Sequence, residues 1–183
     1  MSKSRVEHGI YFSSEDYIGL GRRLLIEAVD AIIALVLWLL LTILIALMLP
    51  PDDAVLMRVM FWTGVALLLL YFVGMKRSSR RTLGYVLARA RLVDLQGQSP
   101  SWLSLLVRLS FIVFGPLNPL LDLFWISADP CRQALRDKFA GTYVIRNNAK
   151  PLGAGVIEYK NYYLLCFSFT FREVRATEAV NAP

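Results

Sequence analysis

The stretch AIIALVLWLLLTILIALML, residues 31–49, carries no charged side chain and decides the fold class. As an α-helix a run of this length rises about 28 Å, close to the roughly 30 Å hydrocarbon core of a bilayer. A helix on the surface of a soluble domain turns one face to water and therefore carries polar residues at regular intervals. This run lacks such a periodicity, and it predicts a helix that spans a membrane.

A second apolar stretch, residues 54–73, follows after the short link PPDD at residues 50–53. Proline ends the first helix and aspartate suits the start of the next, so the two predicted helices are antiparallel neighbours. The link contains no Lys or Arg, whereas residues 75–91 contain six. The positive-inside bias then places both ends of the hairpin, and the N-terminus, in the cytoplasm.

A third apolar region, residues 102–126, is interrupted by GPLNP at residues 115–119 and carries Arg108 and Asp122. Each half is too short to cross a bilayer alone. Two short helices that enter the membrane and return fit these facts best, and a single proline-kinked crossing is the alternative. Arg108 and Asp122 lie at similar distances from the break, so we expect them to pair across it.

Three segments have strand-like patterns: residues 88–94, 141–146 and 162–171. They alternate in polarity or are rich in β-branched and aromatic residues, and we expect them to form one small sheet. The expected fold is an all-α membrane protein, with a two-span hairpin, a broken third hydrophobic helical region and a small cytoplasmic β element. The expected organisation is a polar lead-in over residues 1–20, a membrane domain over 21–146 and a strand-like extension with a tail over 147–183.

The net charge of +6 could suggest nucleic-acid binding, but the basic residues cluster beside the apolar segments. That placement favours a role in topology and in contact with anionic lipid headgroups, for which Lys76, Arg77, Arg80 and Arg81 are the candidates. HExxH, GxSxG, a phosphate-binding glycine loop and a His/Cys cluster are all missing from the sequence. We therefore expect neither an enzyme nor a bound metal or cofactor.

Charged residues gather at the start of the first predicted helix. Arg23, Glu27 and Asp30 follow at i, i+4 and i+7 and share one stripe, with Arg22 beside it. A charge at membrane depth is costly unless paired, which makes such residues functional candidates. Because residues 31–49 can span alone, the stripe is either an interfacial ion cluster or a site that handles an ion or a partner. We expect Arg23 and Asp30 to form an ion pair.

A second polar cluster is DPCRQALRDKFAGT, residues 129–142. If it is helical, Gln133 and Asp137 share a face and Gly141 is a natural stop. The segment is then either an amphipathic surface helix or one that brings Asp137 to the arginines of the first helix. Its spacing leaves both open.

Three stretches in order resemble motifs of the RDD family of small bacterial membrane proteins, named for one arginine and two aspartates. GLGRRLLIEAVDAII, residues 19–33, is similar to the first-helix pattern of that family. TLGYVLARARLVDLQGQSPS, residues 82–101, resembles the loop T-P-G-K-R-x-x-G-x-R-V-V. ADPCRQALRDKFAGTYVI, residues 128–145, resembles the ending D-x-x-R-Q-x-x-H-D-K-x-A-G-T. The likeness covers about residues 17 to 146.

The resemblance places the family's arginine on Arg23 or its neighbour Arg22, and the first aspartate on Asp30. The second falls on Asp137, with Asp129 as the rival. Tyr85 and Val86 stand where Lys-Arg is usual. Two further departures are single substitutions: Arg89 replaces a glycine and Arg136 replaces a histidine.

Since the family has been proposed to act in transport, including cation/proton exchange, the resemblance implies cation or proton handling by membrane-embedded Arg and Asp residues. Two spans cannot enclose a pathway, so this function requires a homo-oligomer or a partner membrane protein. The alternative is a non-catalytic accessory or scaffold subunit of a membrane complex, whose basic loops bind anionic lipids.

Overall fold

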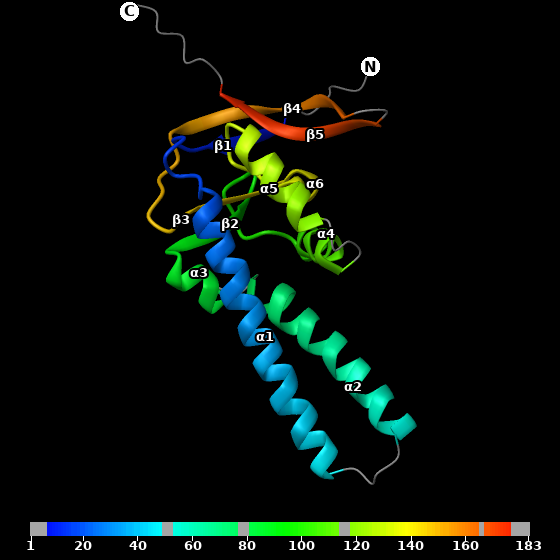
Figure 1. The fold of residues 1–183 in the computed structure, drawn as a ribbon. Coiled ribbons are helices and arrows are strands. Elements are labelled where there is room, and N and C mark those ends of the chain that lie inside the picture. Colours follow the sequence, from blue (N-terminus) through cyan, green and yellow to red (C-terminus); the bar gives the residue numbers. More distant parts are fainter. Residues whose placement is uncertain (1–6, 49–52, 77–80, 114–117, 165–166, 177–183) are drawn as a thin grey trace, which may run out of the picture. The chain divides into compact units, whose positions relative to one another are not determined.

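The computed structural model describes residues 7–48, 53–76, 81–113, 118–164 and 167–176 (Figure 1). The chain divides into two compact units. One, here called the hairpin unit, is Gly21–Ala88. The other, the mixed unit, combines Met1–Leu20 with Arg89–Pro183. Each is described by itself.

The hairpin unit contains the two long apolar helices that the sequence predicts. Helix α1 is Leu20–Met48, and α2, Asp53–Leu68, continues as the π-helix η1, Leu69–Met75. Leu20–Met48 and Ala54–Met75 are each long and apolar enough to cross a membrane. Of the 18-residue apolar stretch of each helix, only 6% is buried within the protein. The predicted pair of helices is therefore confirmed by length and composition, while the link at residues 50–52 lies outside the described residues.

A short helix completes the hairpin unit. Helix α3, Leu83–Leu87, begins after Thr82 and is followed by Ala88 in helical conformation. The π-helix before it is an uncommon element, and π-turns within helices occur often at functional sites. Here η1 buries Tyr71, Phe72 and Val73.

The mixed unit contradicts the all-α expectation. Of the residues that the structure describes, about 54% are helical and 24% are strand, in two antiparallel sheets. One sheet has the order β1-β4-β5, with β1 at His8–Tyr11, β4 at Gly153–Leu164 and β5 at Phe167–Ala176. The other pairs β2, Ala90–Asp94, with β3, Thr142–Arg146.

The expected single sheet of three segments is also wrong. Residues 88–94 and 141–146 do pair, but residues 162–171 straddle the end of β4 and the start of β5, which form one long hairpin. Strands that are close in sequence close a smaller loop, so a hairpin partner costs less entropy than a distant one. The polar lead-in supplies the third strand, with His8 opposite Val156.

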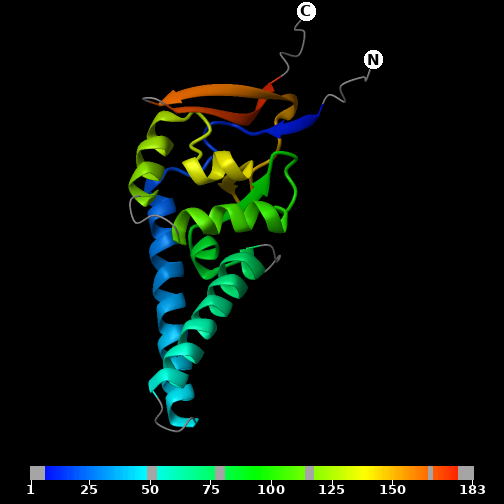
Figure 2. The ribbon, with the colours of Figure 1, turned by 90° about the vertical axis from the view of Figure 1, so that its right-hand side faces the viewer.

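Three helices of the mixed unit lie on one side of the β1-β4-β5 sheet (Figures 1 and 2). Helices α4, Trp102–Val113, and α5, Asn118–Ala128, flank residues 114–117, which confirms that the third apolar region forms two short helices. Whether they re-enter or cross a membrane stays a prediction. Helix α6, Leu135–Ala140, contacts both β3 and β5.

Helix α6 ends where the sequence predicts but is no surface helix. Gly141 follows it with φ of 61°, the left-handed conformation that glycine adopts without strain. Most of the helix is buried, including its charged residues. It contacts β3, which supplies Tyr143 and Ile145 to the apolar core of the mixed unit. The other members of that core are Phe12, Tyr17, Val93, Leu95, Ala149 and Ile157.

Candidate functional site

The carboxylate of Asp30 is fully buried, at 0% exposure, although α1 is otherwise apolar around it. Its Oδ1 accepts hydrogen bonds from the Tyr71 hydroxyl at 3.1 Å and from the Gly84 N–H at 3.0 Å. Its Oδ2 accepts from the Thr82 hydroxyl at 2.7 Å. Helix α1, η1 and the start of α3 therefore converge on a single carboxylate.

Gly84 stands in the first turn of α3, where backbone N–H groups have no partner within their own helix. Asp30 satisfies one of them from outside. A Cβ at Gly84 would lie 2.5 Å from the carbonyl oxygen of Ile26 and 2.7 Å from Oδ1 of Asp30. Only glycine therefore lets the backbone approach this closely.

These contacts give the T-x-G motif a physical role. Thr82 and Gly84 are the Thr and Gly that the sequence aligns with the family loop, and both donate to Asp30. Sequence reasoning missed this link and the contact with Tyr71. The available signal was the spacing of threonine and glycine within the motif, which fits a helix start that binds an anion.

The other residues of the first stripe differ in burial. Arg23 is buried at 4% exposure, Arg22 is exposed and Glu27 is half-buried. This distribution identifies Arg23, rather than Arg22, as the arginine on the buried face of α1 with Asp30. The hydrogen bonds described for Asp30 come from neutral donors, and the Arg23–Asp30 ion pair stays a prediction.

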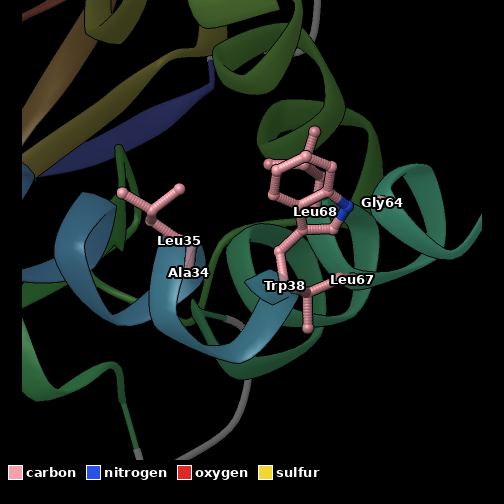
Figure 3. A pocket seen from close by; sticks show the side chains of 6 residues that line it. All are labelled: Ala34, Leu35, Trp38, Gly64, Leu67 and Leu68. Carbon is pink, nitrogen blue, oxygen red and sulfur yellow. The ribbon is translucent and has the colours of Figure 1, made fainter. Parts of the chain in front are cut away.

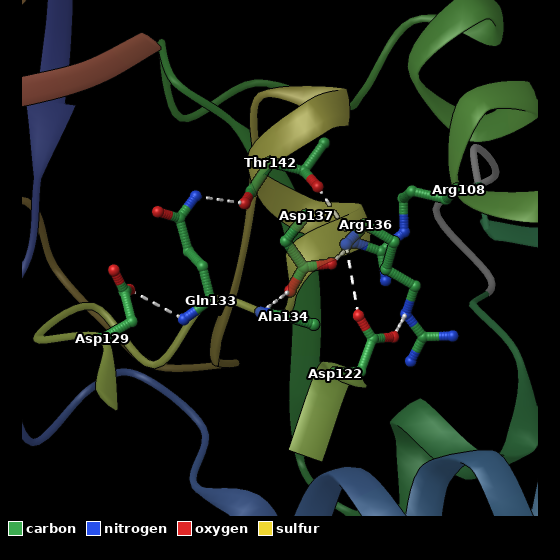
Figure 4. A network of polar contacts seen from close by, with 8 residues as sticks. All are labelled: Arg108, Asp122, Asp129, Gln133, Ala134, Arg136, Asp137 and Thr142. Atoms are coloured by element: carbon green, nitrogen blue, oxygen red, sulfur yellow. Dashed lines mark hydrogen bonds and ion pairs between the residues drawn. The ribbon is translucent and has the colours of Figure 1, made fainter. Parts of the chain in front are cut away.

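Asp137 belongs to a second cluster, in the mixed unit (Figure 4). It too is fully buried, and its Oδ1 is paired with the guanidinium of Arg108 on α4. The same guanidinium donates to the Thr142 hydroxyl at 2.9 Å. Oδ2 of Asp137 accepts the N–H of Ala134 at 3.2 Å, so Asp137 also caps its own helix.

The predicted partner of Arg108 is wrong. Arg108 pairs with Asp137, whereas Asp122 of α5 pairs with Arg136, Nε to Oδ2 at 3.0 Å. Asp122 also accepts the backbone N–H of Arg136 at 3.2 Å. Helix α6 packs against both α4 and α5. Its consecutive residues Arg136 and Asp137 therefore pair with Asp122 and Arg108, the two residues that were expected to pair with each other.

Lys138 is the centre of a third group of charges. Its side chain is buried, and Nζ contacts Oδ1 of Asp129 at 2.5 Å and also the carboxylate of Glu173 on β5. Asp129 in turn accepts the N–H of Gln133 at 3.0 Å. Tyr162 on β4 donates its hydroxyl to Glu173 at 2.5 Å. Asp129, the alternative candidate for the family's second aspartate, therefore forms an ion pair with Lys138.

The ionisation of this group follows from its contacts. Burial alone would lower the pKa of Lys138, but its hydrogen bonds with Asp129 and Glu173 outweigh burial and raise that pKa. Burial would raise the pKa of Glu173, but Lys138 and the Tyr162 hydroxyl hold that pKa below its usual range. Burial and the bond with Glu173 raise the pKa of Tyr162. The charged forms of Lys138 and Glu173 are therefore the stable ones.

Sequence reasoning missed Lys138, Glu173 and Tyr162. Lys138 is the lysine of the D-K pair in the family ending. Glu173 and Tyr162, on the C-terminal hairpin, lie outside the three family motifs, so no sequence pattern indicated them. Among the predicted headgroup residues, Lys76 is buried, with its ammonium 4.9 Å from the ring centre of Phe72 and 5.4 Å from that of Tyr85. This is not the exposed position expected of a headgroup contact. Arg81 is half-buried. Arg77 and Arg80 lie outside the described residues.

The described residues contain no group of three or more His, Cys, Asp or Glu side chains that could hold a metal ion. The buried carboxylates are instead bound by hydroxyls, backbone N–H groups and protein cations. Such an arrangement can hold charge in the interior, and the hydrogen bonds described for Asp30 come from the Tyr71 and Thr82 hydroxyls and the Gly84 N–H.

No curated protein and no solved structure matches the chain. The model of the RDD family matches residues 17–141. This stretch includes α1 with Asp30, the T-x-G turn and α6 with Asp137, and it ends before the β4–β5 hairpin. Because the match takes in more than half of the sequence and is consistent with the two apolar helices, the chain belongs to the RDD family.

Proposed function

We propose that this protein is an integral inner-membrane protein that handles cations or protons as an oligomer, with Asp30 as the exchanging carboxylate. The observation that carries the proposal is a fully buried carboxylate on a membrane-length helix, bound by three neutral donors. An ionisable residue in such a segment is a functional candidate by default, because its charge is costly there.

Asp30 suits exchange better than the other carboxylates. Asp137, Asp122 and Asp129 each contact a buried cation, and a paired carboxylate that loses its charge leaves that cation uncompensated. The hydroxyls of Tyr71 and Thr82 are different, because a hydroxyl donates to a carboxylate and accepts from a carboxylic acid. Carboxylate and hydroxyl oxygens are also ligands that hard cations prefer. The Asp30 site therefore accommodates both charge states.

Oligomerisation is part of the proposal. Two helices cannot enclose an ion pathway by themselves, and each leaves nearly all of its 18-residue apolar stretch exposed. A second copy or a partner membrane protein supplies the missing walls. In this arrangement both ends of the hairpin face the cytoplasm, as the distribution of Lys and Arg indicates.

Ion flux in liposomes that contain the purified protein alone tests the proposal. A pH-sensitive dye inside the liposomes reports proton movement after an inward Na⁺ or K⁺ gradient is imposed. The wild type is expected to move protons in response, and Asp30→Asn is expected to abolish the response while the protein remains folded in gel filtration. Glu158→Gln, which changes an exposed carboxylate on β4 in the same way, is the matched control and should keep the flux. A folded, oligomeric wild type that shows no flux would overturn the proposal.

The second candidate function is that of a non-catalytic accessory or scaffold subunit. It is favoured by the four carboxylate–cation contacts of the mixed unit, which join α4, α5, α6 and β5 through paired opposite charges. In this case Asp30→Asn lowers the melting temperature, and neither the wild type nor the variant shows flux. The same liposome experiment, combined with thermal melting, therefore separates the two functions.

A further inference from the structure

An apolar groove lies between α1 and α2 in the hairpin unit (Figure 3). It has a volume of about 330 Å³. About one turn of each helix lines it: Ala34, Leu35 and Trp38 from α1, and Gly64, Leu67 and Leu68 from α2. The indole N–H of Trp38 is the one polar side-chain group among these six residues. The groove is thus an almost wholly hydrocarbon surface.

Small side chains on facing helices make room for the groove. A Cβ at Gly64 would lie 3.1 Å from Nε1 of Trp38, so the glycine leaves space for the indole. Ala34 provides a second short side chain on the opposite wall. In membrane helices small residues let neighbouring groups approach closely. Here they leave a hollow that a slender apolar chain can enter.

The depth of the groove follows from the sequence. The uncharged run of α1 begins at Ala31, and Ala34 to Trp38 lie about 5–11 Å beyond that point. Half of the hydrocarbon core is about 15 Å thick, so the groove lies within the leaflet at this end of the hairpin. The same end is basic, with Arg22 exposed on α1 and Arg81 half-buried after η1. Basic residues beside a membrane helix attract anionic headgroups.

We propose that the groove binds one acyl chain of an anionic phospholipid from the leaflet at the basic end of the hairpin. Water is a poor occupant, because apolar cavities remain dry. A helix of a second copy makes contact along several turns, with axes 8–10 Å apart, whereas this groove extends over about one turn. Its volume is at the lower end of the roughly 300–1,000 Å³ of small-ligand sites, which suits part of a single chain.

The groove adjoins the Asp30 site. Ala34 lies one turn after Asp30 on α1, and Leu68 is the last residue before η1, whose Tyr71 donates to Asp30. A chain in the groove therefore contacts the helical turn from which the π-helix starts, and it stabilises the register that places Tyr71 on the carboxylate. The inference depends on the hairpin lying in a bilayer and not on ion exchange, so lipid binding and flux succeed or fail separately.

Quenching of Trp38 by brominated lipid tests the proposal. The full-length protein is placed in phosphatidylcholine bilayers with increasing fractions of phosphatidylglycerol that carries dibrominated chains. The tryptophan emission of the wild type minus that of Trp38→Phe gives the emission of Trp38. The same subtraction with Trp62→Phe gives the emission of Trp62, an exposed tryptophan of α2. Trp38 is expected to be half-quenched at a bromolipid fraction at least threefold lower than Trp62. When brominated phosphatidylcholine replaces brominated phosphatidylglycerol, the ratio between the half-quenching fractions of Trp62 and Trp38 should fall by at least half.

Variants that fill the groove complete the test. Ala34→Leu places extra methyl groups in the groove and should raise the half-quenching fraction of Trp38 to that of Trp62. Ala46→Leu makes the same change at an exposed position of α1 and should have no effect. Leu68→Phe narrows the groove from α2 and replaces Ala34→Leu if that variant does not fold. Three results would each overturn the proposal: equal quenching of Trp38 and Trp62, a Trp38 that no bromolipid quenches, or quenching that the filled groove leaves unchanged.

Discussion

The backbone N–H of Gly84 donates to Oδ1 of Asp30 over 3.0 Å, although the two residues are 54 positions apart. The contact joins the start of α3 to the N-terminal half of α1 and leaves no room for a side chain on Gly84. A carboxylate that is otherwise costly to bury thereby gains a backbone donor at a helix start, where unpaired N–H groups favour an anion. The T-x-G turn and the first aspartate of the family thus form one structural unit.

Gly84→Ala is expected to destabilise the protein by about 1–3 kcal/mol, because the new methyl group must displace either the Ile26 carbonyl or the Asp30 carboxylate. Thermal melting in detergent measures the change. Gly21→Ala is the matched control: no atom lies within 4 Å of its Cβ, and on α1 alanine is favoured over glycine by about 0.5–1 kcal/mol. Equal melting temperatures for wild type and Gly84→Ala would contradict the close approach.

Arg89→Gly is expected to stabilise the protein by about 1 kcal/mol. Arg89 is exposed and has φ of 51°, a left-handed conformation that costs residues other than glycine roughly 1–2 kcal/mol. The family loop has glycine at this position, and the backbone conformation explains why. The measurement is again the melting temperature. Arg175→Gly, at an exposed position of β5, should instead lose about 0.5–1 kcal/mol, and a loss at Arg89 would refute the argument.

The two membrane-length helices could be predicted from sequence because a bilayer dictates both the length and the composition of what crosses it. The break in the third apolar region was equally clear, since proline and glycine interrupt a helix locally. Gly141 was predictable for the same reason. These features depend on neighbours in the chain.

The contacts of the site depend on residues that are far apart in the chain, and the sequence offered little for them. Tyr71 and Thr82 reach Asp30 across 41 and 52 positions, and Glu173 reaches Lys138 across 35. The pairing of Arg108 with Asp122 followed from symmetry about the break, but it left out Asp137 and Arg136 of α6, which pair with Arg108 and Asp122. The all-α expectation failed because residues 8–11 and 153–161 were not predicted as strands, and because residues 162–171 were interpreted as one strand although they include the end of β4 and the start of β5.

A double-mutant cycle distinguishes the observed charge pairs from the expected one. Arg108→Ala leaves Asp137 without its buried cation and should cost about 3–5 kcal/mol. Combined with Asp137→Ala, it should show strong coupling, because the second change removes the uncompensated charge. Combined with Asp122→Ala, it should be close to additive, since Asp122 pairs with Arg136. Unfolding in detergent provides the four free energies of each of the two cycles, and coupling of Arg108 to Asp122 rather than to Asp137 would reverse this assignment.

An ion pair between Glu173 and Lys138 links the C-terminal hairpin to the D-K pair of the family ending. The pKa of Glu173 is held below its usual range by Lys138 and Tyr162, despite burial. A carboxyl whose pKa is depressed by folding stabilises the folded protein at every pH above its unfolded-state pKa, about 4.3, and loses that contribution as pH falls through the lower, folded-state pKa. Glu173→Gln should therefore melt at a lower temperature than wild type at pH 7, and the difference should shrink steadily below about pH 4. Glu158→Gln, on the exposed side of the same hairpin, should show no comparable pH-dependent difference. A Glu173→Gln difference that persists unchanged into acid would show that the hairpin is held by its aromatic contacts, such as Phe139 with Phe171, and that Glu173 adds no charge-dependent stability.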